Sequence, residues 1–325
     1  MSRSEGSDGT AFQLTGSLHS CSKNTAGTKP IRGPPELNKV LPSLAAINTI
    51  TKPSKHADLP VDVLLLTVKN CEFLACYSEL KNPYRCYFDG LGYVYFSDVD
   101  GSQEKVKVAL LKCYENSSCP GGSLISVKNA ATALRPKAVI SVGACSGLHP
   151  EKCKLGDVVV SAKLATYASK VVINDQEQST GTRNYVSKCF LDVIKNCADG
   201  WQAPVKNLAD AEQVQVYTAA EILSGPEQVI SGQRCDQLAE TNPQAIAMEN
   251  EGEGSPTALL HPVFIRTCTQ PGQALLEVER DTVECIILSC TRKAKNVFPS
   301  KHQKVRSLAL KVMSVSFVGK SPRFC

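Results

Sequence analysis

Short apolar runs rich in Val, Leu and Ile recur through the middle of this 325-residue chain. The run VDVLLLTV at 61–68 has almost no polar positions, which is typical of a strand buried on both faces of a parallel sheet. Similar runs, bounded by turn residues, predict further strands. The predicted strands cover residues 61–68, 84–88, 91–99, 138–142, 158–161 and 214–223.

Amphipathic segments lie between these runs. In EFLACYSELK at 72–81, apolar residues recur at helical spacing along one stripe. The same reasoning predicts helices over residues 72–81, 103–115, 123–134, 187–201 and 227–242. Strands that alternate with helices predict an α/β domain with a largely parallel sheet.

The two ends of the chain differ from this middle part. Residues 1–57 are rich in Ser, Gly, Thr, Lys and Pro, which predicts a disordered segment with one short helix from Ser43 to Ile50. After Gly254 the periodic pattern stops, although 284–290 and 307–318 could each form a strand. We therefore expect three parts: a disordered segment at 1–57, a domain at 58–254 and a divergent basic segment at 255–325.

The net charge of +5 is unevenly distributed along the chain. Residues 291–325 contain nine Lys or Arg and no acidic residue, which leaves 27 basic and 31 acidic residues elsewhere. Such a tail can contact nucleic acid or an acidic membrane, or it can simply be solvated. No nucleic-acid motif accompanies it, so we expect no nucleic-acid partner. No run of 18 apolar residues and no apolar leader are visible, which predicts a cytoplasmic protein without a membrane span.

Fifteen cysteines are scattered along the chain without a C-x-x-C pair or a Cys/His cluster at zinc spacing. In a reducing compartment such cysteines behave as small buried hydrophobic residues. We therefore expect free thiols and no bound metal.

Two segments and one carboxylate are candidates for chemistry. The predicted strand at 138–142 is followed by GACSG at 143–147. A loop of small residues lets a ligand approach the backbone N–H groups, although it can equally be a tight turn.

The other segment, AMENEGEG at 247–254, contains three closely spaced glutamates. Among these, Glu251 could accept hydrogen bonds from vicinal sugar hydroxyls, or the segment could be a solvated acidic turn. Glu72 could be a general acid or base, or a first-turn carboxylate facing the helix dipole.

Three stretches together resemble the markers of the nucleoside phosphorylase and nucleosidase superfamily. RPKAVISVGACSGLHPEKCKLGDVVVS at 135–161 resembles its strand, small-residue loop, Gly-Asp turn and Val-rich strand. ILSGPEQV at 222–229 resembles its Ser-Gly turn, and ENEGEG at 249–254 resembles its Glu-Met-Glu-Gly marker. The resemblance is closest to methylthioadenosine/S-adenosylhomocysteine nucleosidase-like domains of animal proteins. It implies a three-layer α/β/α fold with a mixed, largely parallel central sheet.

The resemblance also implies roles for individual residues. Gly143, Ala144, Cys145 and Ser146 match the loop that lies against ribose and base. Ser224 and Gly225 match the turn beside the base. The segment Glu249, Asn250 and Glu251 matches the ribose marker, in which Glu251 is the carboxylate that binds the sugar hydroxyls. Glu72 matches, on a loose alignment, the carboxylate that activates the attacking water.

The chain departs from the family at three positions. Phosphorylases carry an Arg at the position of Ser141, and a hydroxyl cannot replace its bidentate phosphate contacts, so water is the expected nucleophile. Asn250 replaces a Met that packs against the sugar. The family's last marker is a buried strand followed by an Asp that protonates purine N7. We find no such pattern after Gly254, where Asp281 is the only Asp.

Three hypotheses follow. The first is a purine nucleoside hydrolase of methionine salvage, needing no cofactor, that cleaves methylthioadenosine, S-adenosylhomocysteine or related adenine nucleosides. The second is a nucleoside-binding module impaired by loss of the catalytic Asp, and the third is a phosphate-dependent phosphorylase. In each case we expect a small-molecule purine nucleoside as ligand and assembly into a homo-oligomer.

Overall fold

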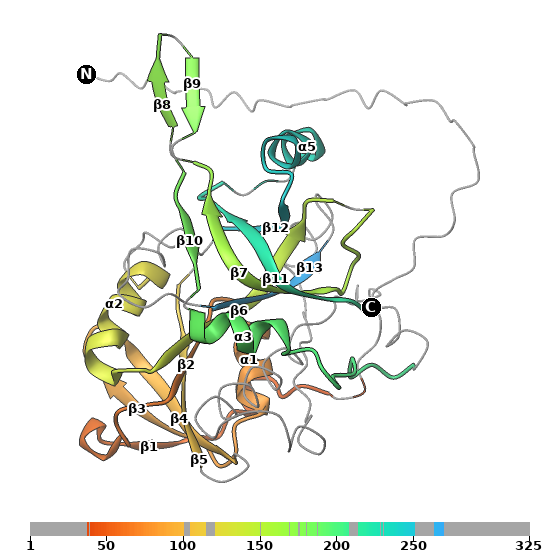
Figure 1. The fold of residues 1–325 in the computed structure, drawn as a ribbon. Coiled ribbons are helices and arrows are strands. Elements are labelled where there is room, and N and C mark those ends of the chain that lie inside the picture. The colour runs from red at the N-terminus through yellow and green to blue at the C-terminus, as the bar shows by residue number, and fades with distance from the viewer. Residues whose placement is uncertain are drawn as a thin grey trace, which may run out of the picture. The chain divides into compact units, whose positions relative to one another are not determined.

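The computed structural model shows the chain as a strand-rich α/β domain (Figure 1). The residues that the structure describes are 38, 40–100, 105–114, 121–149, 151–168, 170–174, 176–179, 181–186, 188–207, 214–227, 229, 231–250 and 263–269. They all belong to the compact unit Pro34–Cys325.

The strands are β1 (Ile50–Lys52), β2 (Val63–Thr67), β3 (Tyr84–Phe88), β4 (Gly92–Asp100), β5 (Lys105–Lys112), β6 (Ala138–Gly147), β7 (Val158–Thr166), β8 (Lys170–Ile173), β9 (Gln176–Ser179), β10 (Arg183–Tyr185), β11 (Val216–Ser224), β12 (Ala245–Glu249) and β13 (Val263–Thr269). The helices are α1 (Asn70–Ser78), α2 (Ser123–Leu134), α3 (Lys188–Lys195) and α5 (Gly232–Thr241). Two 3-10 turns, η1 (Leu44–Ala46) and η2 (Ser54–His56), precede β2.

One mixed sheet organises the domain, and part of it closes on itself. Its strand order is β1-β3-β4-β5-β2-β6-β12-β11-β7-β10, and β13 pairs with both β6 and β7. The pairs β6–β13, β13–β7, β7–β11, β11–β12 and β12–β6 therefore form a closed ring of five strands. Figure 1 shows these strands together, with the hairpin β8–β9 projecting beyond β7 and β10.

Helices cover both faces of the open part of the sheet. Phe73 of α1 and Ile194 of α3 share a hydrophobic cluster with Leu65 of β2. On the opposite face, Val127 of α2 packs in a cluster with Leu64. Alternate residues of β2 thus face opposite helical layers, as the pleat of a strand requires. The predicted three-layer α/β/α fold with a mixed, largely parallel sheet is confirmed.

The segment 103–115 was predicted to be a helix, and this was wrong. It contains strand β5, which lies between β4 and β2 in the sheet. Its residues alternate between buried and more exposed at Lys105–Lys107 and are then buried on both faces at Val108–Leu111. A short apolar run of this kind fits helical and strand spacing equally well, and the neighbouring strands decided between them.

The small-residue segment 143–147 is the end of strand β6 and not a loop. The sequence predicts no strand closely following Gly254, whereas β13 runs parallel to β6 over seven residue pairs. The sheet therefore continues past residue 254. It also begins before residue 58, because β1 pairs with β3.

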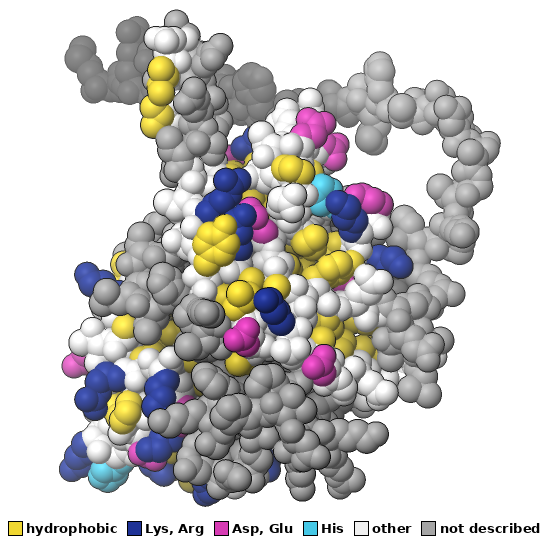
Figure 2. All heavy atoms as spheres, in the orientation of Figure 1, with side chains coloured by type: hydrophobic (Ala, Val, Ile, Leu, Met, Phe, Trp, Pro, Cys, Tyr) yellow, Lys and Arg dark blue, Asp and Glu magenta, His cyan; other side chains and the backbone are white. Residues whose placement is uncertain are grey.

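The remaining predicted helices correspond to α1, α2, α3 and α5. The short helix predicted from Ser43 is the single turn η1, which Ser43 caps by accepting a hydrogen bond from the Ala46 amide at 3.2 Å. Among the described residues, none of the helices has the length and apolar character to cross a membrane. On the face drawn in Figure 2, Lys and Arg side chains gather at the end of the sheet that contains β1 and β3.

Candidate functional site

Glu72 is a buried carboxylate at the start of α1, with 3% of its surface exposed. Its Oε2 accepts hydrogen bonds from the backbone amides of Val68 and Lys69, each at 2.9 Å. Its Oε1 accepts a third bond, at 3.1 Å, from the amide of Ala144 in β6. Each carboxylate oxygen can accept about two hydrogen bonds. Oε2 is therefore saturated, whereas Oε1 keeps one acceptor position beside Ala144.

The structure shows the capping interpretation of Glu72, while its role as a general acid or base stays a prediction. From the first turn of α1, Glu72 accepts a hydrogen bond from the amide of the N-cap residue Lys69, as a helix-capping carboxylate does. It also contacts the small-residue segment, 72 positions away in the chain. The contact is possible because β2 and β6 are parallel neighbours. Their carboxyl ends, which carry α1 and Ala144, therefore lie at one edge of the sheet.

The end of β6 needs small residues because it is crowded. It pairs with β13 over Gly143 to Ser146 and with β12 at Ser146 and Gly147. A Cβ at Gly147 would stand 3.3 Å from the Cβ of Cys153, closer than ordinary packing allows. Gly143 and Cys145 are buried, while Ala144 and Ser146 are partly exposed.

Ser224 and Glu249 are the last residues of β11 and β12 and are paired in register. Both residues are buried: Ser224 is 0% exposed and Glu249 is 6% exposed. Two residues earlier on the same strands, Ile222 and Ala247 pack in one cluster with Cys145. Since alternate residues of a strand share a face, Ser224 and Glu249 lie on the same side of the strands as Cys145.

The antiparallel pairing of β12 with β6 joins these residues to the small-residue segment. Met248 lies opposite Ser146, and Glu249 is the next residue of β12. Gly225 donates a hydrogen bond from its amide to the Glu249 carbonyl at 3.3 Å. The structure therefore brings Gly143, Ala144, Cys145, Ser146, Ser224, Gly225 and Glu249 together, with Glu72 at Ala144.

The hydroxyl of Ser224 is buried and has no hydrogen-bond partner in the described part of the chain. A buried hydroxyl without a partner costs about 1–3 kcal/mol. Such a group at the end of two strands, beside a buried carboxylate, is therefore a candidate for contacting a ligand.

Two of the predicted site residues are not placed in this group. Glu251, the predicted sugar-binding carboxylate, lies outside the described residues. The other is Asn250, which the structure describes as exposed.

Ser141 occupies the position at which the resemblance implies an arginine in phosphorylases. It is buried within β6.

Sequence reasoning missed Tyr167, which supports the Ser-Gly turn. Its ring packs so closely on Gly225 that a Cβ there would overlap the ring, and its amide donates to the Ser224 carbonyl at 3.3 Å. The ring is 5% exposed. Tyr167 follows β7 in LATY and carries no signal of this role in the sequence, because the contact depends on the pairing of β7 with β11.

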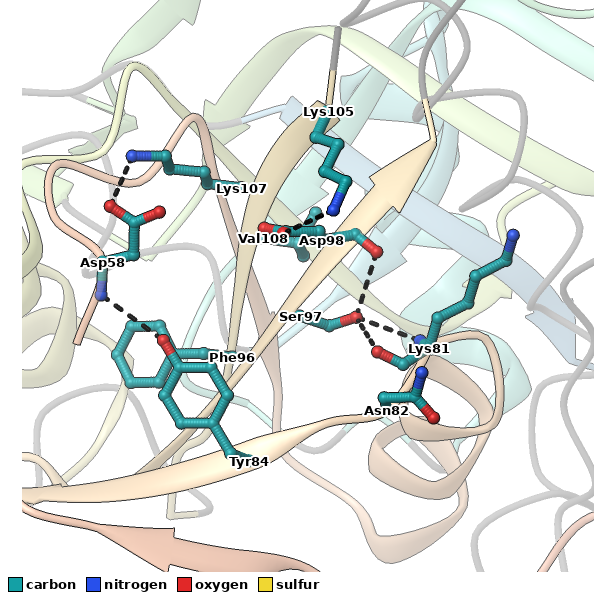
Figure 3. Close-up of a pocket in the computed structure, with 10 residues that line it drawn as sticks. All are labelled: Asp58, Lys81, Asn82, Tyr84, Phe96, Ser97, Asp98, Lys105, Lys107 and Val108. Carbon is teal, nitrogen blue, oxygen red and sulfur yellow. Dashed lines mark hydrogen bonds and ion pairs between the residues drawn. The ribbon is translucent and has the colours of Figure 1, made fainter. Parts of the chain in front are cut away.

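A hollow of about 480 Å³ is lined by residues of β3, β4 and β5 together with Asp58, Lys81 and Asn82 (Figure 3). Four of its charged groups are paired: Lys107 Nζ lies 2.5 Å from Asp58, and Lys105 Nζ lies 3.7 Å from Asp98. The Tyr84 ring is also in contact with stacked Phe96 and with the ammonium of Lys52, which lies 3.9 Å from the ring centre. This hollow shares no residue with the site at the ends of β6, β11 and β12.

Within the described ranges no group of three or more His, Cys, Asp or Glu side chains is arranged to hold a metal ion. Eight cysteines within these ranges are free thiols: Cys71, Cys76, Cys86, Cys113, Cys145, Cys153, Cys197 and Cys235. Burial raises the pKa of the Cys76 thiol well above its ordinary value, with Glu72 adding a second, Coulombic contribution. Cys76 is thus a neutral packing residue of α1.

Comparison with known proteins shows which fold the chain has. No protein-family model and no curated protein matches the chain, but many solved structures do. A methylthioadenosine/S-adenosylhomocysteine nucleosidase from Streptococcus pneumoniae, solved with 8-aminoadenine, is similar with a TM-score of 0.51 and 18% identity, over 65% of this chain and 87% of that one. Its counterpart from Colwellia psychrerythraea, solved with adenine, gives 0.54 and 11%, over 67% and 86%. The chain has the nucleoside phosphorylase fold.

A second structure of the Streptococcus pneumoniae enzyme, with a transition-state inhibitor, matches over 78% of this chain and 99% of that one, with a TM-score of 0.53 and 16% identity. The resemblance inferred from the three sequence markers is therefore confirmed at the level of the fold. Similarity to animal proteins in particular stays a prediction.

Proposed function

We propose that the chain binds an adenine nucleoside at the ends of β6, β11 and β12 and cleaves its N-glycosidic bond. The observation that most supports this proposal is the hydrogen bond that the Ala144 amide donates to Glu72. It holds a buried carboxylate, with one acceptor position left on Oε1, at the segment that the resemblance assigns to ribose and base. A carboxylate in this position can take a proton from an attacking water.

Water is the proposed nucleophile because Ser141 stands where phosphorylases carry an arginine. Ser141 is buried in β6, and a hydroxyl lacks the charge and the forked donors that bind phosphate. Two carboxylates are candidates for binding the sugar hydroxyls. One is Glu249, which is buried beside Ser224. The other is Glu251, to which the resemblance assigns this role. Hydrogen bonds to these hydroxyls strengthen as the sugar gains oxocarbenium character.

A specific observation supports the second candidate, a nucleoside-binding module with impaired catalysis. The resemblance implies a buried strand followed by an acid that protonates the leaving base. β13 is a strand in the sheet, and its last residue, Thr269, lies beside Ser146. The next residue in the sequence is Gln270. An amide cannot supply the proton, so turnover would be slow even where the nucleoside binds.

The expected biological setting follows from these proposals. We propose a cytoplasmic role in purine nucleoside metabolism, with methylthioadenosine or S-adenosylhomocysteine of methionine salvage as the first substrates to try. We also propose a homo-oligomer. The support is the nucleosidase fold and the adenine compounds present in the similar structures.

The testing experiment is chromatographic detection of free base from methylthioadenosine, S-adenosylhomocysteine, adenosine, inosine and ATP, with and without phosphate. We expect slow release of adenine that does not depend on phosphate. Calorimetry with the same nucleosides distinguishes the two candidates, because an impaired module binds without turnover. Phosphate-dependent release would overturn the choice of water, and absence of both binding and turnover would overturn the proposal.

Replacing Ser224 with Ala is expected to have opposite effects on stability and binding. It removes a buried hydroxyl without a partner, so the free protein should gain about 1 kcal/mol, which thermal unfolding measures. The same change should weaken nucleoside binding roughly tenfold, by the loss of one ligand hydrogen bond of about 1.4 kcal/mol. Lower stability together with unchanged affinity would show that the hydroxyl serves the fold and not a ligand.

A further inference from the structure

Glu221 is a buried carboxylate on β11 that the proposed chemistry does not use. It is 7% exposed and forms an ion pair with Lys163 of β7. Arg183 of the edge strand β10 approaches its Oε1 at 3.8 Å. The Lys163 ammonium also lies 5.6 Å from the centre of the Tyr185 ring. Three neighbouring strands thus meet at one buried negative charge.

The register of β11 is irregular immediately before Glu221. The pairing of β11 with β7 shifts between Tyr217 and Ala220 and again between Ala220 and Glu221. Its pairing with β12 shifts between Glu221 and Ile222. Ala219 has a φ of +58°, a left-handed conformation that costs energy in a residue with a Cβ.

Regular pairing resumes at the ion pair. Glu221 lies directly opposite Lys163, and from there to Ser224 opposite Thr166 the register with β7 is unbroken. A slip of one residue would turn every following side chain to the other face of the strand. It would move the Ser224 hydroxyl away from Cys145 and Glu249.

We propose that Glu221 and Lys163 are positioning residues that fix the register of β11 and so hold Ser224 and Gly225 in the nucleoside site. A buried ion pair is a weak source of stability compared with apolar packing, but buried polar and ionic groups select one register among several in some proteins. A slipped β11 would leave the buried Glu221 carboxylate without Lys163 opposite it, and an unpaired buried charge is costly. This inference rests on the proposed function only for the identity of the ligand.

The first measurement is the dissociation constant of methylthioadenosine by calorimetry. We expect Glu221→Gln and Lys163→Met each to weaken binding 10-fold or more. The double charge reversal, Glu221→Lys with Lys163→Glu, rebuilds the pair and should restore part of the affinity, while Arg183 then faces an ammonium in place of a carboxylate. The matched control is Asp58→Asn, which removes the ion pair with Lys107 on the other part of the sheet and should leave binding unchanged.

The second measurement is hydrogen exchange of the peptide that ends at Gly225, whose amide bonds to the Glu249 carbonyl. In Glu221→Gln this peptide should exchange at least 10-fold faster, while peptides from β2 stay protected. Unchanged exchange in β11 would overturn the inference whatever the ligand. If the native chain binds no nucleoside, the proposed function fails, and the exchange data still decide the role of the pair.

Discussion

Gln270→Asp is expected to raise the rate of adenine release from methylthioadenosine by roughly 10²-fold, since general acid catalysis contributes about 10² to 10⁴. The physical reason is the leaving group, which departs faster when an acid protonates its nitrogen. Thr269, the last residue of β13, lies beside Ser146 at the end of β6, and Gln270 follows it in the sequence. The measurement is single-turnover release of base with enzyme in excess.

The control for this variant is Gln270→Asn, which shortens the side chain as Asp does but provides no acid. It should not exceed the native rate. A pH profile adds a second check, because the gain should fall as pH rises through the pKa of the introduced carboxyl. If the Asp variant binds nucleoside and is no faster than the Asn variant, the missing acid does not limit the reaction.

Glu72→Gln is expected to lower the same rate by about 10²-fold or more, measured in the Gln270→Asp background where turnover is easier to follow. An amide cannot accept a proton from water. Its NH₂ group must also face one of three backbone N–H donors, those of Val68, Lys69 and Ala144. Leaving a buried donor without a partner costs about 1–3 kcal/mol, so the unfolding temperature should fall as well.

The loss of activity and the loss of stability can be separated. Glu79→Gln changes a carboxylate at the other end of α1 and should leave the rate within a factor of about two, as expected for a residue without a role in the site. Rates at a temperature where circular dichroism shows Glu72→Gln fully folded then report chemistry alone. Full activity in the folded variant would contradict the assignment of Glu72 as the base and leave it as a structural cap.

The sequence predicted strands best where the pattern was unambiguous. The runs around β2 and β6 are apolar at consecutive positions and belong to the centre of the sheet. β5 was mistaken for a helix because its apolar residues satisfy both periods. β13 was missed because Val263–Thr269 mixes polar and apolar residues, and its partners, β6 and β7, lie about 100 or more residues away in the sequence.

Part of the candidate site could be named from the sequence, although its role in binding stays a prediction. Local markers singled out Ser224, Gly225 and the segment Gly143 to Ser146, because a small-residue strand end and a Ser-Gly turn can be recognised within a few residues. Tyr167 and Glu221 carry no such marker. The roles that we propose for them depend on the pairing of β7 with β11, and single-sequence patterns contain no information on which strands become neighbours.

By itself the sequence determined the fold class, the order of most elements and the residue types available for nucleoside chemistry, because apolar periodicity and turn residues act locally. The tertiary structure decided three further matters: that five strands close into a ring, that the Glu72 carboxylate reaches the Ala144 amide, and that Ser224 and Glu249 end side by side. Each of these depends on contacts between segments far apart in the chain. Such contacts form only when the whole sheet assembles and the cost of ordering the intervening chain is offset by burial.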